Sequence, residues 1–253
     1  MSMIWLASFP RSGNTFLRNV LYELYGLESS AISEKTLMDP AKALQKPVVK
    51  THLRPHEVLA LAPDVPKVYL VRDGRDALVS LAYHRSNIIA PGSSYRKNLM
   101  DAFLAREGTF FGGWHQNVLE WLFQADLIIR FEDLIEDPAG QAERFRKLVD
   151  LPEARLDQLP TFDSQKFGSP KYGPKRGKTE LFFRKGKIGD WKDEMPWLVK
   201  WRFWRKNAPL MKLLGYGKKG EVLSMDELAA IQKQAATVFP QQHCKLMTKP
   251  FQS

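Results

Sequence analysis

A polar stretch near the start of the chain, residues 8–18, carries the side chains best suited to bind an anion. An apolar, strand-like segment precedes it, and a segment with large apolar residues at helical spacing follows it. A loop between a strand and a helix directs backbone N–H groups at one point, which suits a phosphate. Arg11 adds a positive charge, and Gly13 lets a ligand approach the backbone. Ser12 and Thr15 add hydroxyl donors, so the stretch predicts a phosphate-binding loop.

This loop is not a Walker A motif, which needs a second glycine followed by a lysine and a serine or threonine. Here a single glycine, Gly13, follows Arg11. An ordinary strand-to-helix turn, capped by Ser12 or Asn14, would explain the same residues without a ligand. The loop alone therefore leaves phosphate binding and a plain helix cap both open.

Polar residues also end two further predicted strands. Lys50 and His52 close the predicted strand 47–51, and Arg72 closes the predicted strand 68–71. In open α/β sheets, ligands bind at the carboxyl ends of the strands. We therefore expect a lysine, a histidine and an arginine to meet the loop at one edge of a sheet.

Strand-like and helical segments alternate along the chain. We predict strands over 3–7, 47–51, 68–71 and 127–131, and helices over 15–24, 55–62, 77–87, 97–107, 114–124, 138–149, 197–214 and 225–238. This alternation is typical of an α/β fold with a mainly parallel sheet.

Two segments lack a clear period. Residues 29–46 indicate a connector with a short helix that starts near Ser33, and residues 160–185 form a basic, glycine-containing stretch. Long free loops are usually functional or disordered. In the predicted helix 197–214, the expected core anchors are Trp197, Trp201, Trp204 and Leu214.

Composition limits the class of protein. A chain of 253 residues is long enough for a full core, and its net charge of +10 indicates an anionic partner. The only cysteine, Cys244, excludes an internal disulfide and fits a reducing compartment. No basic leader precedes the first predicted strand, and no apolar run approaches the ~20 residues that span a bilayer. We expect a cytoplasmic protein without a membrane partner.

Four separated stretches, in the family's order, resemble the motifs of the sulfotransferases that use 3′-phosphoadenosine 5′-phosphosulfate (PAPS). They are the 5′-phosphosulfate loop at 10–16, the Lys-Thr-His strand end at 50–52, the 3′-phosphate motif at 72–80 and the C-terminal nucleotide signature at 184–192. Weaker likeness covers residues 113–121, 131–133 and 213–216. We therefore expect a sulfotransferase domain over 1–217, with a C-terminal helical extension, 218–253, packed on the same domain.

The resemblance implies a fold and a reaction. The fold is a single α/β domain with a central, mainly parallel sheet flanked by helices, related to the P-loop nucleotide kinases. The reaction transfers a sulfuryl group from PAPS to a hydroxyl or an amine of a small molecule and leaves adenosine 3′,5′-bisphosphate (PAP). No metal is implied, and His52 and His56 are not expected to share one because Pro55 interrupts the helix between them.

The resemblance also assigns roles to residues. His52 would be the general base, and Lys50 and Arg11 would stabilise the leaving group. The expected nucleotide-binding residues are Arg11, Ser12, Gly13, Asn14, Thr15, Phe16, Arg72, Ser80, Phe131, Phe183, Arg184, Lys185 and Gly186. The expected acceptor residues are Phe9, Tyr83, His84, Trp114 and His115, whose polar members favour a polar small molecule, such as a bacterial natural product, over a steroid.

Some positions depart from the family's pattern. Arg11, Phe16 and Phe131 stand where many members have lysine, tryptophan and tyrosine. Residues 195–197 replace the Thr-Val motif of the known dimers, so the oligomeric state is open. Of the remaining residues near the motifs, we expect Arg75 to be a solvated bystander and Trp191 to lie in the core.

Two other classes of function remain open from the residues. The first is an ATP-dependent, kinase-like transferase, which is disfavoured because the loop lacks the Walker lysine. The second is a nucleic-acid-binding module, which the net charge would allow. The basic residues fall mostly at the motifs and in residues 160–192 rather than along one helix, so we expect no nucleic-acid partner.

Overall fold

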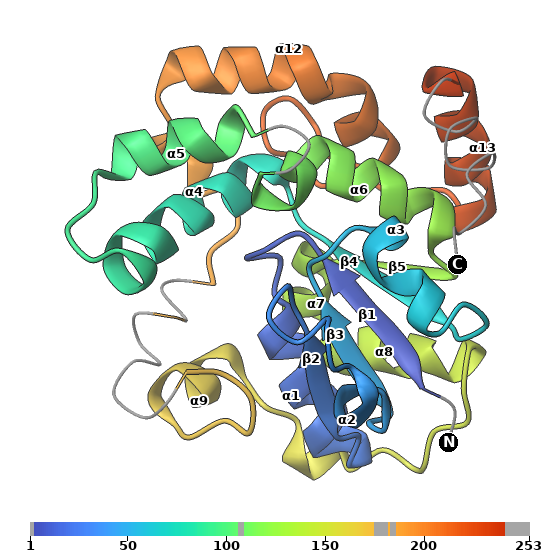
Figure 1. Cartoon of the computed structure of the whole chain (residues 1–253). Helices are drawn as coiled ribbons and strands as arrows, with labels where there is room; N and C mark the ends of the chain where they lie inside the picture. Colours follow the sequence, from blue (N-terminus) through green and yellow to red (C-terminus); the bar gives the residue numbers. More distant parts are fainter. Residues whose placement is uncertain (1–2, 106–108, 175–181, 183–185, 241–253) are drawn as a thin grey trace.

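A computed structural model describes residues 3–105, 109–174, 182 and 186–240. It contains a five-stranded parallel sheet in the order β2-β3-β1-β4-β5 (Figure 1). The strands are β1 (Ile4–Ser8), β2 (Ser29–Ile32), β3 (Val48–Thr51), β4 (Lys67–Val71) and β5 (Leu127–Arg130). The predicted fold class, a single α/β domain with a central parallel sheet, is confirmed.

Helices connect the strands and cover the sheet. They are α1 (Asn14–Tyr25), α2 (Ala41–Leu44), α3 (Pro55–Val58), α4 (Gly74–His84), α5 (Tyr95–Phe103), α6 (Gly113–Gln124), α7 (Phe131–Glu136), α8 (Pro138–Glu143), α9 (Phe162–Phe167), α11 (Trp191–Glu194), α12 (Trp197–Leu213) and α13 (Leu228–Val238). A π-helical turn, Arg85–Ile89, continues α4, and short 3₁₀ turns lie at Leu59–Leu61, Phe110–Gly112, Arg144–Lys147 and Leu156–Gln158.

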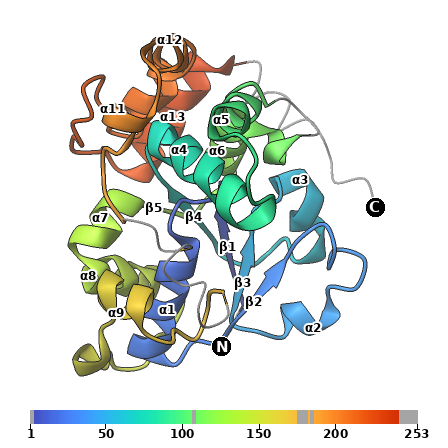
Figure 2. The same cartoon turned by 90° about the vertical axis from the view of Figure 1, so that its left-hand side faces the viewer.

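The strands β1, β3, β4 and β5 are largely buried on both faces because their side chains alternate between two hydrophobic clusters. In β1, Trp5 and Ala7 enter one cluster with residues of α3, α4, α6 and α12. Ile4 and Leu6 enter the other cluster with residues of α1, α7 and α8. Figure 2 shows α1 and α8 on one side of the strands and α3 on the other. This arrangement leaves the carboxyl ends of the strands open to a ligand.

The strand β2 was not predicted from the sequence, whose pattern indicates a connector there and a short helix from Ser33. The segment Ser29–Ile32 instead pairs in parallel with β3 at the edge of the sheet. Only Ile32 of this strand is buried, so its sequence lacks the apolar run that marks β1 and β4. The first helical turn expected after Ser33 is a hydrogen-bonded turn, and α2 begins at Ala41.

Two expectations about the second half of the chain need correction. The aperiodic stretch contains α9, which is capped by Thr161. In α12, Trp197 and Trp201 are exposed (73% and 51%), and the helix buries Val199 and Phe203 instead. Leu214, which caps the helix, is buried as expected. Trp204 is half-buried and packs against the core, as expected. The helix therefore faces the core with a different stripe from the one that Trp197 and Trp201 indicated.

Several helices end earlier than predicted. The predicted helices 55–62 and 138–149 each become a short α-helix followed by a 3₁₀ turn. Phe131, expected at the end of a strand, begins α7. The last helix, α13, buries Ile231 and Ala235 in the same hydrophobic cluster as α6 and α12.

Candidate active site

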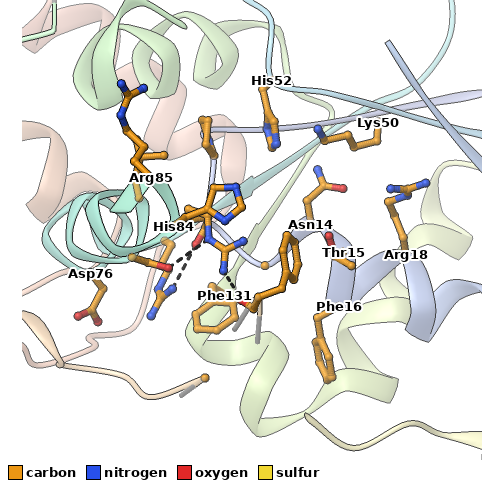
Figure 3. Close-up of a pocket in the computed structure, with 18 of the residues that line it drawn as sticks. Asn14, Thr15, Phe16, Arg18, Lys50, His52, Asp76, His84, Arg85 and Phe131 are labelled. Atoms are coloured by element: carbon orange, nitrogen blue, oxygen red, sulfur yellow. Dashed lines mark hydrogen bonds between the residues drawn. The ribbon is translucent and has the colours of Figure 1, made fainter. Parts of the chain in front are cut away.

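A cavity of about 520 Å³ opens at the carboxyl ends of β1, β3 and β4 (Figure 3). This edge is where ligands bind in open α/β sheets. The cavity brings together predicted residues from separate parts of the chain: Arg11, Gly13, Asn14, Thr15, Phe16, Lys50, His52, Arg72, Ser80, His84, Phe131 and Gly186. Three predicted nucleotide-binding residues, Phe183, Arg184 and Lys185, lie outside the described residues.

The loop after β1 folds back under the cavity because two of its residues adopt left-handed backbone conformations. Gly13 has φ +95° and precedes the first turn of α1, and Arg11 has φ +67°. A Cβ atom on Gly13 would lie 2.4 Å from the Phe131 ring. Position 13 therefore needs glycine for its backbone angle and for the close approach of this ring.

Arg11 and Arg72 are tied together at this loop. The Arg11 Nε donates a hydrogen bond to Ser80 Oγ at 3.2 Å, and Arg72 Nη1 donates to the Arg11 carbonyl at 3.1 Å. The Arg72 guanidinium also lies 4.3 Å from the centroid of the Phe131 ring. The structure thus joins the first and the third sequence motifs into one cationic wall.

His52 is held by β1. Its Nδ1 lies 2.7 Å from the Ser8 carbonyl oxygen, which can only accept, so Nδ1 carries the proton and Nε2 keeps its lone pair. Burial lowers the pKa of His52 well below its usual 6.5, and the neighbouring Lys50 charge lowers it further. His52 is therefore a neutral imidazole with a free acceptor nitrogen at neutral pH.

Lys50 precedes it on β3, and Figure 3 shows both side chains reaching into the same cavity. Burial, and to a smaller extent the positive charge of Arg18, lower the pKa of Lys50 to about 7. Among the described residues, no carboxylate forms an ion pair with Lys50. An anion in the cavity would stabilise its charged form.

The start of α4 fixes a second loop at the cavity. The Asp76 carboxylate accepts hydrogen bonds from the backbone N–H groups of Gly189 (2.7 Å) and Trp191 (2.9 Å). Arg72 Nη2 donates to the Lys187 carbonyl at 3.0 Å. The helix that begins at Gly74 therefore holds the segment after Gly186 against the third motif, although more than a hundred residues separate them in sequence.

Arg75 is not solvated, which corrects the expectation for this residue. It is 1% exposed, pairs with Asp73 and donates hydrogen bonds to the carbonyls of Gly217 and Lys218. Its guanidinium lies 3.8 Å from the Trp191 ring centroid. Arg75 therefore joins α4 to the segment before α13 and takes no part in the cavity. Trp191 is buried, as expected of a core residue.

Four of the five residues expected to contact the acceptor do not line this cavity. Phe9 is fully buried in the core, and the Tyr83 hydroxyl donates to Glu194. The Trp114 indole donates to the Arg72 carbonyl, and His115 lines a separate cavity of about 190 Å³. His84 does line the main cavity, where burial and the Arg11 charge lower its pKa to about 4.

Sequence reasoning missed several lining residues. They are Pro10, Arg18, Ala31, Asp76, Leu81, Arg85, Ile89, Phe110, Phe111, Phe162, Phe182, Lys187 and Asp190. The helical spacing from Ser80 through Leu81 to His84 and Arg85 could have indicated some of them. Phe162, whose ring centroid lies 6.1 Å from that of Phe16, enters from α9 and gave no such signal.

Several buried polar atoms at the motifs have no hydrogen-bond partner among the described residues. They include Ser12 Oγ, Asn14 Oδ1, Arg72 Nε and His84 Nδ1. Buried polar groups are normally paired, so such atoms indicate a ligand or ordered water. Of these atoms, Ser12 Oγ and Arg72 Nε can donate, and together with the lining cations they fit an anionic nucleotide, whereas Asn14 Oδ1 can only accept. No cluster of three metal-ligating side chains occurs in the described part of the chain, and the expected absence of a metal stays a prediction.

No helix among the described residues is long and apolar enough to cross a membrane. The family profile described as "Sulfotransferase domain" matches residues 2–215. Among curated proteins, rat sulfotransferase 1 family member D1 is 26% identical over 231 residues, covering 76% of this chain and 77% of the relative. Mouse sulfotransferase 1E1 is 25% identical over 237 residues, covering 78% and 79% of the two chains.

Two solved structures share the fold. Mouse sulfotransferase SULT7A1, complexed with PAP, superposes with a TM-score of 0.65 at 20% identity and covers 83% of this chain and 85% of its own. Retinol dehydratase, in complex with androsterone and the inactive cofactor PAP, has a TM-score of 0.56 at 18% identity and covers 83% and 80%.

Proposed function

We propose, since the chain belongs to the sulfotransferase family, that this cavity is the active site and that His52 is its general base. PAPS supplies the sulfuryl group when it is bound. The acceptor is a hydroxyl or an amine of a small molecule. The sulfur–oxygen bond to the acceptor forms as the bond between sulfur and the 5′-phosphate oxygen breaks, and the acceptor's proton goes to His52 Nε2.

The observation that carries this proposal is the hydrogen bond between His52 Nδ1 and the Ser8 carbonyl. It fixes the tautomer in which Nε2 can take a proton, while the lowered pKa keeps the ring neutral. A positioned base of this kind typically contributes ~10²–10⁴-fold to the rate. Ser8 ends β1, so the same strand that leads into the phosphate loop also orients the base.

Lys50 and Arg11 would stabilise the negative charge that develops on the leaving phosphate. Arginine stays protonated and suits phosphate binding, but it is a poor proton donor. Lys50 can change its protonation state near neutral pH because its pKa is lowered to about 7. We therefore assign any proton donation to the leaving group to Lys50 and electrostatic stabilisation to Arg11.

The nucleotide would lie along the side of the cavity formed by the loop after β1, Arg72 and Ser80. Arg72 and Ser80 would bind the 3′-phosphate, together with Gly186 and the residues Arg184 and Lys185 that lie outside the described part. Phe16, Phe131 and Phe162 offer aromatic surface for adenine. The backbone N–H groups of residues 12–15 would receive the 5′-phosphate.

The identity of the acceptor stays a prediction. A bacterial natural product was expected from polar residues of which Tyr83 and His115 do not line the cavity. His84 and the pair Phe110 and Phe111 do line it. Two further statements are likewise predictions, the domain boundary at residue 217 and the cytoplasmic location. The oligomeric state stays open.

A calorimetric titration tests the nucleotide assignment. PAP is titrated into the wild-type chain and into Arg72→Ala, beside ATP and AMP, with Arg96→Ala as a control because Arg96 is exposed and lies outside the cavity. We expect PAP to bind and ATP and AMP to bind weakly, and Arg72→Ala to weaken PAP by about 10- to 100-fold. Equal or tighter binding of ATP would favour the kinase-like alternative and contradict the assignment.

A further inference from the structure

The cavity extends past His52 along a wall that no motif predicted. The ring centroids of His52 and Phe111 are 5.8 Å apart, and the guanidinium of Arg85 lies 4.8 Å from the centroid of the Phe110 ring. Phe110 and Phe111 are adjacent in sequence, so their two rings together link the His52 imidazole to the Arg85 guanidinium. Figure 3 shows Arg85 on the side of α4, across the cavity from Phe16 and Arg18 on α1.

The two phenylalanines hold an unusual backbone conformation. Their φ angles are +44° and +57°, in a region that bulky residues rarely adopt. Such strain persists only where surrounding contacts impose it, and it concentrates at functional sites. Here Asn117 Nδ2 donates to the Phe111 carbonyl at 3.2 Å and to the His52 carbonyl at 3.1 Å. One buried amide therefore sets the wall in place relative to the base.

Arg85 lies one helical turn after Leu81 and begins a turn in which the helix changes its pitch. The π-helical turn Arg85–Ile89 follows α4, and its first and last residues both line the cavity. Turns of this kind are rare and often occur at functional sites. Leu81 and the two phenylalanines add apolar surface at the same end of the cavity, and His84 lies beside them as a polar neighbour.

Within the part of the chain that the structure describes, the Arg85 charge has no acidic partner. Among the described residues, no aspartate or glutamate forms an ion pair with it, and its Nε donates to Asn98 Oδ1 at 3.5 Å, the limit for a hydrogen bond. The described acidic residues that line the cavity are Asp76 and Asp190, and neither forms an ion pair with Arg85. The Asp76 carboxylate already accepts hydrogen bonds from two backbone N–H groups. An anionic group of a ligand would supply the missing partner.

We infer that the acceptor has an aromatic or apolar body that lies on Phe110 and Phe111 and a carboxylate that pairs with Arg85. This inference rests on the proposed function, because it assumes that the acceptor hydroxyl beside His52 is the one that receives the sulfuryl group. A guanidinium binds a carboxylate through two parallel hydrogen bonds, which gives orientation as well as affinity. Arg85 would thus select hydroxylated acids over neutral alcohols and phenols of the same shape.

The test compares acids with their methyl esters. The probes are 4-hydroxyphenylacetic, 3-(4-hydroxyphenyl)propionic and 4-(4-hydroxyphenyl)butyric acid, because the series varies the distance between hydroxyl and carboxylate. With PAPS as donor, kcat/KM is measured for the wild type, Arg85→Ala, Arg85→Lys and the control Arg96→Ala. We expect at least one acid to exceed its ester by about tenfold or more. Arg85→Ala should abolish that preference, Arg85→Lys should keep part of it, and Arg96→Ala should leave it unchanged.

A binding titration provides a readout that does not need turnover. Each acid and ester is titrated into the protein saturated with PAP, and we expect acids to bind more tightly in the wild type but not in Arg85→Ala. Equal binding and turnover of acids and esters in the wild type would overturn the inference and leave the sulfotransferase assignment intact. An equal loss for both in Arg85→Ala, with PAP binding unchanged, would also overturn it. Failure to bind PAP at all would instead contradict the proposed function.

Discussion

The end of the cavity proposed for the nucleotide and the end proposed for the acceptor are built in different ways. At the nucleotide end, β1 and β4 pair directly in the sheet and lead into the loops that carry Arg11 and Arg72. At the acceptor end, a π-helical turn and two residues with positive φ form the wall. Regular backbone pairing places the strand ends that lead into the first end, although Arg11 and Gly13 in its loop also have positive φ. The second end depends on side chains such as Asn117.

This difference separates recognition of the nucleotide, which does not depend on the acceptor, from recognition of the acceptor itself. A parallel sheet places the carboxyl ends of its strands side by side whatever the acceptor is, so the phosphate-binding residues lie in short, recognisable motifs. The acceptor wall comes from residues 81–89 and 110–111, whose sequence carries no motif. Changes at the two ends should therefore affect different measured quantities.

The largest expected effect concerns the residue between the two ends. His52→Ala removes the proposed base and should lower kcat by ~10²–10⁴-fold. The affinity for PAP should change little, because the sheet still holds the loop. His56→Ala is the control, since His56 is exposed and does not line the cavity. Unchanged turnover in His52→Ala, measured with radiolabelled sulfate from PAPS, would remove the base assignment.

A glycine pair tests how tightly the nucleotide end is packed. Gly13→Ala places a methyl group 2.4 Å from the Phe131 ring at φ +95°, whereas Gly92→Ala meets no atom within 4 Å at φ +83°. Both variants incur a backbone cost of about 1–2 kcal/mol, and Gly13→Ala adds an overpacking cost of about 1–3 kcal/mol.

Thermal unfolding and PAP titration distinguish the two glycine variants. Each kcal/mol corresponds to about 2–4 °C in Tm for a domain of this size. We expect Gly13→Ala to have the lower Tm and weaker PAP binding, and Gly92→Ala to bind PAP normally. Equal Tm values for the two variants would show that the Phe131 contact does not constrain the loop.

Lys50 should take up a proton when PAP binds. Its pKa in the folded protein is lowered to about 7, so about one pH unit above that value it is mostly neutral, and a neighbouring phosphate raises its pKa. Calorimetry in buffers of different ionisation enthalpy should show uptake of up to about one proton, which Lys50→Met should abolish. Lys50→Ala should also lower turnover, and unchanged turnover would remove its assignment to the leaving group.

The same lowered pKa has a consequence for stability. In the unfolded chain Lys50 titrates near 10.5, so the unfolded state holds more protons between that pH and about 7. The stability cost of Lys50 therefore grows as the pH falls from about 10.5 to about 7 and is constant below. Lys50→Met should unfold at a higher Tm than the wild type near neutral pH, and a lower Tm would contradict the shift.

The smallest effect is expected at the acceptor end. Asn117→Ser removes the amide that donates to the His52 and Phe111 carbonyls, and it should change the acceptor KM and kcat by a few-fold without changing the PAP affinity. Tyr69→Phe is the matched control, because it removes the hydroxyl that donates to Asn117 Oδ1 and bonds to the Phe9 backbone but leaves both donor bonds of Asn117 in place. Weaker PAP binding in Asn117→Ser would show that the two ends are coupled.

Local sequence determined most of the sheet and the nucleotide end. The segments that became β1, β3, β4 and β5 are apolar runs, and the polar residues that follow three of them meet because parallel strands end at one edge. Sequence could not determine β2, because Ser29–Ala31 of this edge strand are not buried and so need not be apolar, whereas the other edge strand, β5, is buried throughout.

Tertiary packing decided the rest. Three features depend on elements that are distant in sequence. They are the stripe of α12 that faces the core, the burial of Arg75 and the position of Phe162 in the cavity. The acceptor wall is the clearest case: Phe110 and Phe111 hold left-handed conformations because Asn117 and the core impose them, and no local preference of phenylalanine predicts that. The sequence therefore indicated where phosphate would bind, and only the folded chain brought Arg85 to the other end of the same cavity.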